Sequence, residues 1–175
     1  DTLRGQEGID TVDYSGANGG VQVDLGAGTA TGADGDDVLD RIENATGSGY
    51  DDELYGDNGV NVLSGGAGDD TLVGRGGNDT LDGGAGDDLL IAAGGDPFGL
   101  AGGAGYDQLY GGPDDILRYD MEEAYRSAVQ ATGVSVDLEM GTATDTFGDT
   151  DTLTGFENVV GGDGDDILIG DAGSN

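Results

Sequence analysis

The stretch Gly65-Gly-Ala-Gly-Asp-Asp-Thr-Leu-Val73 decides the fold, because variants of it recur every nine residues from Gly47 to Tyr110. Positions one, two and four are mostly glycine, position six is Asp or Asn, and position eight is apolar. Five copies stand in register before a ten-residue slip at 92–101, and a further copy follows the slip. A fixed period of this kind indicates a repeat architecture in which each copy is one structural unit.

Each part of the repeat has a physical role. Glycines at positions one, two and four permit positive φ and close approach of the backbone in the turn. Positions seven to nine form a minimal strand whose middle side chain points inward. Two nonapeptides then make one flattened coil, so that alternate turns stack on the same edge and strands pair in parallel. The carboxylate at position six faces a curled backbone, and Ca²⁺ takes about six to eight oxygen ligands from such groups.

The repeat resembles the nonapeptide G-G-x-G-x-D-x-U-x of the RTX family, in which U is a large apolar residue. The resemblance implies an all-β fold, a right-handed parallel β-roll, with Ca²⁺ held between stacked turns by Asp side chains and backbone carbonyls. It also implies a secreted, extracellular bacterial protein exported by type I secretion, with several Ca²⁺ ions as cofactors. The implied metal ligands are the sixth-position residues and their equivalents elsewhere: Asp10, Asp37, Asp52, Asn61, Asp70, Asp79, Asp88, Asp107, Asp115, Asp151 and Asp166.

The spacing of these residues assigns many of them to two edges of the roll. One edge carries a row with separations of 18, 18 and 19 residues, which predicts three metal sites: Asp52, Asp70, Asp88 and Asp107. The other edge carries Asn61 and Asp79. We expect this second edge to be weaker, because Asn61 brings no charge and Pro97 stands where the next acid belongs, with Asp96 beside it.

The composition predicts that folding depends on cations. The chain has 175 residues, a net charge of −32 and 36 Leu, Ile, Val and Phe residues in total, which is close to the composition of disordered proteins. Such a chain buries too little apolar surface to offset both backbone ordering and its own charge repulsion. Bound divalent cations would neutralise the carboxylates, and folding would then be coupled to metal binding.

The same composition excludes several classes of function. The chain has no Cys and no His, which rules out disulfides, Ser-His-Asp catalysis and His-based zinc sites. Five arginines and no lysine argue against a nucleic-acid partner. No apolar run approaches the roughly 18 residues of a membrane span. Adjacent acids recur at the same phase, as Asp51-Asp52, Asp69-Asp70 and Asp87-Asp88, whereas a catalytic pair would be unique, so we expect no enzyme activity in this segment.

The nonapeptide run belongs to a larger repeated unit. Val21-Gln-Val-Asp-Leu25 alternates strictly and reads as a strand, and Gly133–Leu138 matches Gly20–Leu25 at an offset of 113 residues. Truncated copies at both ends predict a piece of a longer chain with other domains. Tandem units of this kind resemble RTX adhesins and the R-modules of alginate C-5 epimerases. We expect five segments: the end of a run (1–13), a strand-rich spacer (14–46), the β-roll (47–118), a second spacer (119–160) and the start of a second run (161–175).

The second spacer is longer than the first and predicts a short helix at 121–131. Asp120 with Glu123 forms a capping box, and Glu122 with Arg126 forms an i,i+4 pair. We interpret this helix as a lid over the end of the roll, with a partner-binding helix as the alternative.

The sequence therefore predicts a calcium-binding, calcium-dependently folding, non-catalytic extracellular module. The alternative is a carbohydrate-binding or adhesive module with an extracellular polysaccharide as partner. Four tyrosines bear on it, as a sugar-stacking platform or as plain outward strand positions: Tyr50, Tyr55, Tyr106 and Tyr110. Glu43 and Glu157 each precede an Asn at matching places. Whether these glutamates cap a turn or reach a cation stays open.

Overall fold

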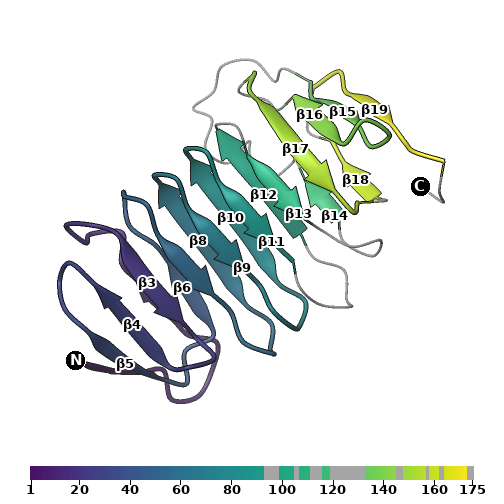
Figure 1. Ribbon diagram of the computed structural model, residues 1–175. Coiled ribbons are helices and arrows are strands. Elements are labelled where there is room, and N and C mark those ends of the chain that lie inside the picture. Colours follow the sequence, from purple (N-terminus) through teal and green to yellow (C-terminus); the bar gives the residue numbers. More distant parts are fainter. Residues whose placement is uncertain are drawn as a thin grey trace.

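The computed structural model describes residues 1–92, 99–104, 107–110, 116–118, 133–144, 148–156, 158–161 and 164–172. These residues form a parallel β-roll of two facing sheets, with the two chain ends at opposite ends of the stack (Figure 1). The predicted all-β class is confirmed. No helix occurs in the described ranges, hence none long and apolar enough to cross a membrane. The helix predicted at 121–131 lies outside them.

Within the described residues the larger sheet has twelve strands and the smaller sheet seven. In spatial order the larger sheet contains β1 (Thr2–Arg4), β5 (Asp37–Asp40), β4 (Thr29–Gly32), β3 (Val21–Asp24), β7 (Glu53–Tyr55), β9 (Thr71–Val73), β11 (Leu89–Ile91), β13 (Gln108–Tyr110), β17 (Thr150–Thr154), β16 (Thr142–Thr144), β15 (Ser135–Asp137) and β19 (Ile167–Ile169). The smaller sheet contains β18 (Asn158–Val160), β14 (Ile116–Arg118), β12 (Gly99–Ala104), β10 (Thr80–Ala85), β8 (Val62–Ala67), β6 (Asn44–Thr46) and β2 (Thr11–Asp13).

The core between the sheets is a stack of position-eight side chains. Six leucines of the nonapeptide run are completely buried: Leu54, Leu63, Leu72, Leu81, Leu90 and Leu109. Each short strand contributes one inward side chain, because successive residues of a strand point to opposite faces. Burial of a leucine stabilises the fold by about 1.5–3 kcal/mol. The core is thus one side chain wide, and the turns must carry much of the remaining stability.

Strand register confirms the predicted coil. Leu54 pairs with Leu72 and Leu72 with Leu90 in parallel, each one coil of eighteen residues apart. Leu90 pairs with Leu109, so the next coil contains one extra residue, as the slip predicts. The slip itself, at 93–98, lies outside the described residues.

Each spacer inserts a backward-running hairpin into the larger sheet. β3 pairs in parallel with β7 of the following coil, β4 runs antiparallel, and β5 returns to pair in parallel with β1 of the preceding coil. β15, β16 and β17 repeat this order between β19 and β13. The smaller sheet receives one strand per spacer, β6 or β18, which explains why the larger sheet has more strands.

Candidate metal centre

A row of buried aspartates runs along the first edge of the roll. None of the five is more than 3% exposed: Asp52, Asp70, Asp88, Asp107 and Asp151. The first four each follow a turn that leads from the smaller sheet into the larger one, whereas Asp151 lies within β17, which follows β16 of the larger sheet itself. The first four stand in the order that their spacing predicts. Asp151 directly follows Asp107 in space although 44 residues separate them in sequence, because β17 pairs with β13.

One oxygen of each carboxylate in this row is used by the backbone. The N–H of Asp52 donates to Oδ1 of Asp70 at 2.8 Å, and the N–H of Asp70 donates to Oδ1 of Asp88 at 2.7 Å. The N–H of Asp88 donates to Oδ1 of Asp107 at 2.8 Å, and that of Asp107 to Oδ1 of Asp151 at 3.2 Å. Every side chain therefore reaches toward the preceding coil and fixes the stacking of two turns.

The second oxygen is buried without a hydrogen bond in Asp70, Asp88, Asp79 and Asp10. A buried carboxylate oxygen of this kind is costly unless a cation or a donor meets it. The first turn differs, because Oδ2 of Asp52 accepts from the N–H of Ser48 at 2.5 Å. In the regular turns, therefore, the buried Oδ2 atom of the sixth-position Asp has no hydrogen-bond donor.

Burial also raises the pKa of these groups. The pKa of Asp88 rises to about 8 and that of Asp70 to about 7, mainly through burial and then through neighbouring carboxylates. The pKa of Asp79 on the second edge rises to about 6, again mainly through burial. The metal-free row therefore resists full ionisation near neutral pH, and a cation would reverse this.

Backbone carbonyls complete the cradle around the second oxygen. A Cβ built on Gly65 would collide with Oδ2 of Asp70 and with the carbonyl oxygen of Gly83 in the next coil. A Cβ on Gly83 would likewise collide with Oδ2 of Asp88 and the carbonyl oxygen of Gly102. Glycine at position one is therefore required, because a side chain would fill the space in which carboxylate and carbonyl oxygens converge.

This donor set fits a hard cation. Ca²⁺ takes oxygen ligands from carboxylates and carbonyls, and both kinds meet in these turns. Among the described residues no group of three or more acidic side chains converges on one point. Much of the coordination must then come from the backbone.

The second edge is built from different residues at the same position. Glu43 stands between Asp10 and Asn61, and its carboxylate accepts from the N–H of Asp10 at 2.9 Å. Asn61 in turn donates from its side-chain amide to the carbonyl oxygen of Glu43 at 2.7 Å, and its N–H donates to Oδ1 of Asp79 at 2.9 Å. Glu43 thus takes the place of the sixth-position acid, which sequence spacing missed because it lies outside a nonapeptide.

The remaining predicted ligands are placed as follows. Oδ1 of Asp166 accepts from the N–H of Val134 at 3.0 Å, which parallels the bond from Val21 to Asp52 at 2.7 Å. Asp37 stands to Asp1 as Asp151 stands to Asp107, because β5 pairs with β1 as β17 pairs with β13. Oδ1 of Asp37 lies 2.8 Å from the nitrogen of Asp1, and its Oδ2 accepts from the phenol of Tyr14 at 2.8 Å. Asp115, like Glu157 and Tyr106, lies outside the described residues.

Comparison with known families identifies the repeat. The model of the RTX calcium-binding nonapeptide repeat matches four copies, at residues 31–72, 64–98, 100–115 and 151–175. The chain belongs to this family. Comparison with curated proteins finds no match. As an RTX chain it binds Ca²⁺, several repeat copies contribute, and the repeat itself is a non-catalytic module.

Proposed function

We propose that this RTX chain is a module of a larger secreted bacterial protein, and that Ca²⁺ switches it from an unfolded to a folded state. The observation that carries the proposal is the row of buried carboxylates on the first edge, where Asp70 and Asp88 each keep an oxygen without a partner. The net charge of −32 adds to the cost of folding without metal. A cation in each turn removes both costs together.

The proposed ligands are the sixth-position acids and their neighbouring carbonyls. On the first edge they are Asp52, Asp70, Asp88, Asp107 and Asp151. Asp79, Asp10 and Asp166 are proposed for further sites, since each has its turn's first glycine against its Oδ2. Asp37 and Asp115 complete the set predicted from the repeat, and Asn61 is its weakest member.

Secretion would move the chain from low to high calcium, and the proposed switch would then fold it after export. RTX repeats are typical of secreted bacterial proteins. Extracellular calcium modules bind with dissociation constants of about 10⁻⁴–10⁻³ M, far above the free calcium inside a cell. The chain would then stay unfolded during transit and fold outside, where calcium is millimolar.

Far-UV circular dichroism of the chain in metal-stripped buffer and in millimolar Ca²⁺ tests this proposal. We expect a coil spectrum without calcium and a β spectrum with it. Equal Mg²⁺ should fold the chain poorly, because Mg²⁺ demands a compact octahedral shell and keeps its waters. A full β spectrum in metal-stripped buffer would refute the switch, and equal folding by Mg²⁺ would reduce it to charge screening.

A second candidate function is polysaccharide binding on the outer face of the larger sheet. The register aligns Tyr55, Val73, Ile91 and Tyr110 in one column across four neighbouring strands. Tyr110 is 40% exposed, and aromatic rings on a flat face suit sugar stacking. Titration of the calcium-loaded chain and of Tyr110→Ala with acidic and neutral glycans tests this function. Binding that Tyr110→Ala does not weaken would remove the face from consideration.

A further inference from the structure

Arg75 departs from the repeat in a way that the turn alone does not explain. It stands at position two of its nonapeptide, where Gly66 and Gly84 adopt φ of 118° and 110°. Arg75 adopts a φ of 70°, in the left-handed region that non-glycine residues rarely enter. Gln6, at position two of its own nonapeptide, adopts a similar φ of 71°, so the contacts of the side chain are what set Arg75 apart.

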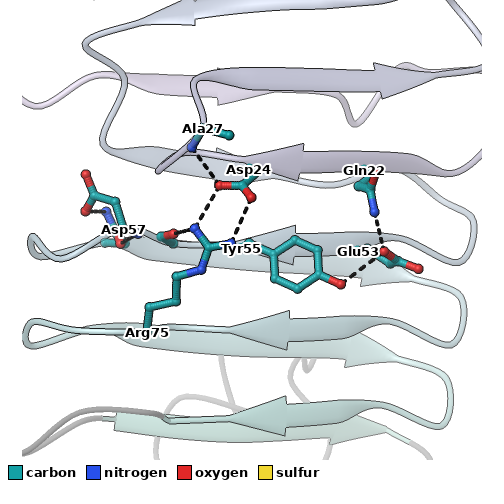
Figure 2. Close-up of polar contacts among 9 residues, drawn as sticks. Gln22, Asp24, Ala27, Glu53, Tyr55, Asp57 and Arg75 are labelled. Atoms are coloured by element: carbon teal, nitrogen blue, oxygen red, sulfur yellow. Dashed lines mark hydrogen bonds and ion pairs between the residues drawn. The ribbon is translucent and has the colours of Figure 1, made fainter.

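Those contacts join three levels of the roll. Nη1 and Nη2 of Arg75 donate to Oδ1 and Oδ2 of Asp24, both at 2.8 Å, and Nη1 also donates to the carbonyl oxygen of Gly56 at 2.9 Å. The guanidinium lies over the ring of Tyr55, 5.4 Å from its centroid. Figure 2 shows the guanidinium between the end of β3, which carries Asp24, and the turn that follows β7. Bidentate pairing of this kind lowers the pKa of Asp24 and keeps its carboxylate ionised.

The place that the guanidinium occupies is equivalent to a cradle on the regular turns. Above Gly65, a carboxylate oxygen meets the carbonyl oxygen of the first glycine in the next coil. Above Gly26 the same two kinds of oxygen meet: a Cβ built there would lie 3.4 Å from Oδ1 of Asp24 and 3.5 Å from the carbonyl oxygen of Gly56. Nη1 of Arg75 lies between them, 2.6 Å from that Cβ position. A cation already stands where the other turns offer oxygens to a metal.

The spacer explains why a metal site is missing here. After β3 the chain reverses into β4, so this turn ends at the hairpin and never reaches a sixth-position acid. Asp24 supplies a carboxylate from the end of the strand instead. We propose that the guanidinium of Arg75 replaces a calcium ion at the joint between the first spacer and the nonapeptide run, so that this joint forms without metal. The proposal rests on the calcium sites assigned to the regular turns.

The test compares Arg75→Gly with a matched control, Arg41→Gly, in the whole chain. Arg41 also has a positive φ, of 58°, but its side chain is 58% exposed. Its contact with Asp40 is long, with 3.7 Å between Nε of Arg41 and Oδ1 of Asp40. Both changes remove one positive charge and relieve left-handed strain. Calcium-dependent folding is followed by circular dichroism, and bound calcium per chain is counted by equilibrium dialysis and atomic emission.

We expect Arg75→Gly to bind one more calcium ion than the native chain and to need more calcium to fold. The emptied place keeps Asp24 and the Gly56 carbonyl oxygen, beside a hollow lined by Asp57 and Asn58. Arg41→Gly should bind the native number of ions. Equal ion counts for the two variants would overturn the proposal.

Arg75→Lys keeps the test decisive if Arg75→Gly does not fold. A lysine ammonium still places a positive charge between Asp24 and Gly56, so the native ion count is expected. An additional ion in Arg75→Lys would overturn the proposal, because a retained charge would then not exclude the metal. If the native chain itself bound no calcium, the failure would lie in the assigned sites and not in the role of Arg75.

Discussion

The Asn61 turn on the second edge of the roll uses the same backbone turn as the first edge but satisfies its sixth residue in a different way. On the first edge, Asp70 and Asp88 each give one oxygen to a backbone N–H and leave the other buried without a partner. On the second edge, Asn61 accepts from the N–H of Asp57 at 2.8 Å and donates to the carbonyl oxygen of Glu43 at 2.7 Å. Replacing one carboxylate oxygen by an amide nitrogen thus lets the turn close on itself.

This difference separates the two tasks of the repeat. The glycines and the position-eight leucines shape the coil on both edges, so the coil forms alike with Asp or with Asn at position six. In the proposed function the sixth residue decides whether the turn needs a cation. Arg75 is a third case: the hairpin after β3 provides no sixth residue, and the guanidinium of Arg75 takes the place of a metal ion there. The turns of one edge can therefore share the same backbone conformation and still differ in whether they require a metal ion.

The largest effect on this comparison is expected from Asp70→Ala. Its carboxylate lies between those of Asp52 and Asp88, so its removal takes an oxygen from two of the proposed metal sites and leaves the Asp52 N–H unpaired. Loss of a charged hydrogen-bonding group costs about 1.5–3 kcal/mol. In the proposed switch several ions bind together with folding, so this cost is divided among them, and we expect the calcium midpoint for folding to rise about two- to fourfold. Circular dichroism and calorimetry at fixed ionic strength measure the midpoint and the number of ions.

Asp69→Ala is the matched control, since it removes the same charge from the neighbouring residue. Asp69 is exposed, and its Oδ1 accepts from the N–H of Asp87 at 3.0 Å in an outer row. Its loss leaves a solvent-accessible N–H and should shift the midpoint only slightly. If the two variants shifted the calcium midpoint equally, the sixth-position carboxylate would not be the calcium ligand.

An intermediate effect is expected from pH in metal-stripped buffer. The pKa values of Asp88 and Asp70 are raised by burial to about 8 and about 7, and that of Asp79 to about 6. A carboxyl group with a raised pKa in the folded state stabilises that state fully below about pH 4. This contribution is lost as pH rises through the folded pKa values. We therefore expect metal-free chain to gain β signal on acidification from pH 8 to pH 4.

With calcium the pH dependence should reverse, because protons compete with the metal for the same oxygens. The calcium midpoint is expected to fall as pH rises from about 5 to 8. Asp88→Asn, which removes the group with the highest of the three pKa values, should flatten the upper part of the metal-free curve. A metal-free curve that is unchanged by Asp88→Asn would show that overall charge, and not the buried row, sets the response.

The fixed period explains what could be predicted from sequence. The row from Asp52 to Asp107 follows from counting, since each residue stands at the same phase of one coil. The place of Asp151 next to Asp107 could not be counted, because the intervening spacer reverses direction and its return strand decides the neighbour. Counting leaves the role of Glu43 open for a related reason: Glu43 lies outside any nonapeptide, and strand pairing brings it into the second row.

The contact between Arg75 and Asp24 was also beyond sequence reasoning. The two residues are 51 positions apart, which is not a multiple of the coil. They meet only because β3 runs ahead to pair with β7 before the chain turns back. A repeat pattern predicts only contacts between equivalent positions of the coil, whereas this contact depends on the β3–β4 hairpin, which interrupts the repeat.

The smallest effect is expected from Asn61→Asp, which gives the second edge the chemistry of the first. The substitution removes the side-chain amide that donates to the Glu43 carbonyl oxygen, and it places a carboxylate oxygen against that carbonyl oxygen. Without metal this repulsion should weaken folding, and with metal a calcium ion can relieve it, so the two changes largely cancel at saturating calcium. We expect a steeper dependence of folding on calcium with a midpoint close to the native one. Asn58→Asp, at an exposed position of the same turn, adds the same charge and should leave the steepness unchanged. Superimposable titrations of the two variants would mean that the hydrogen bonds of Asn61 do not decide whether its turn takes a metal.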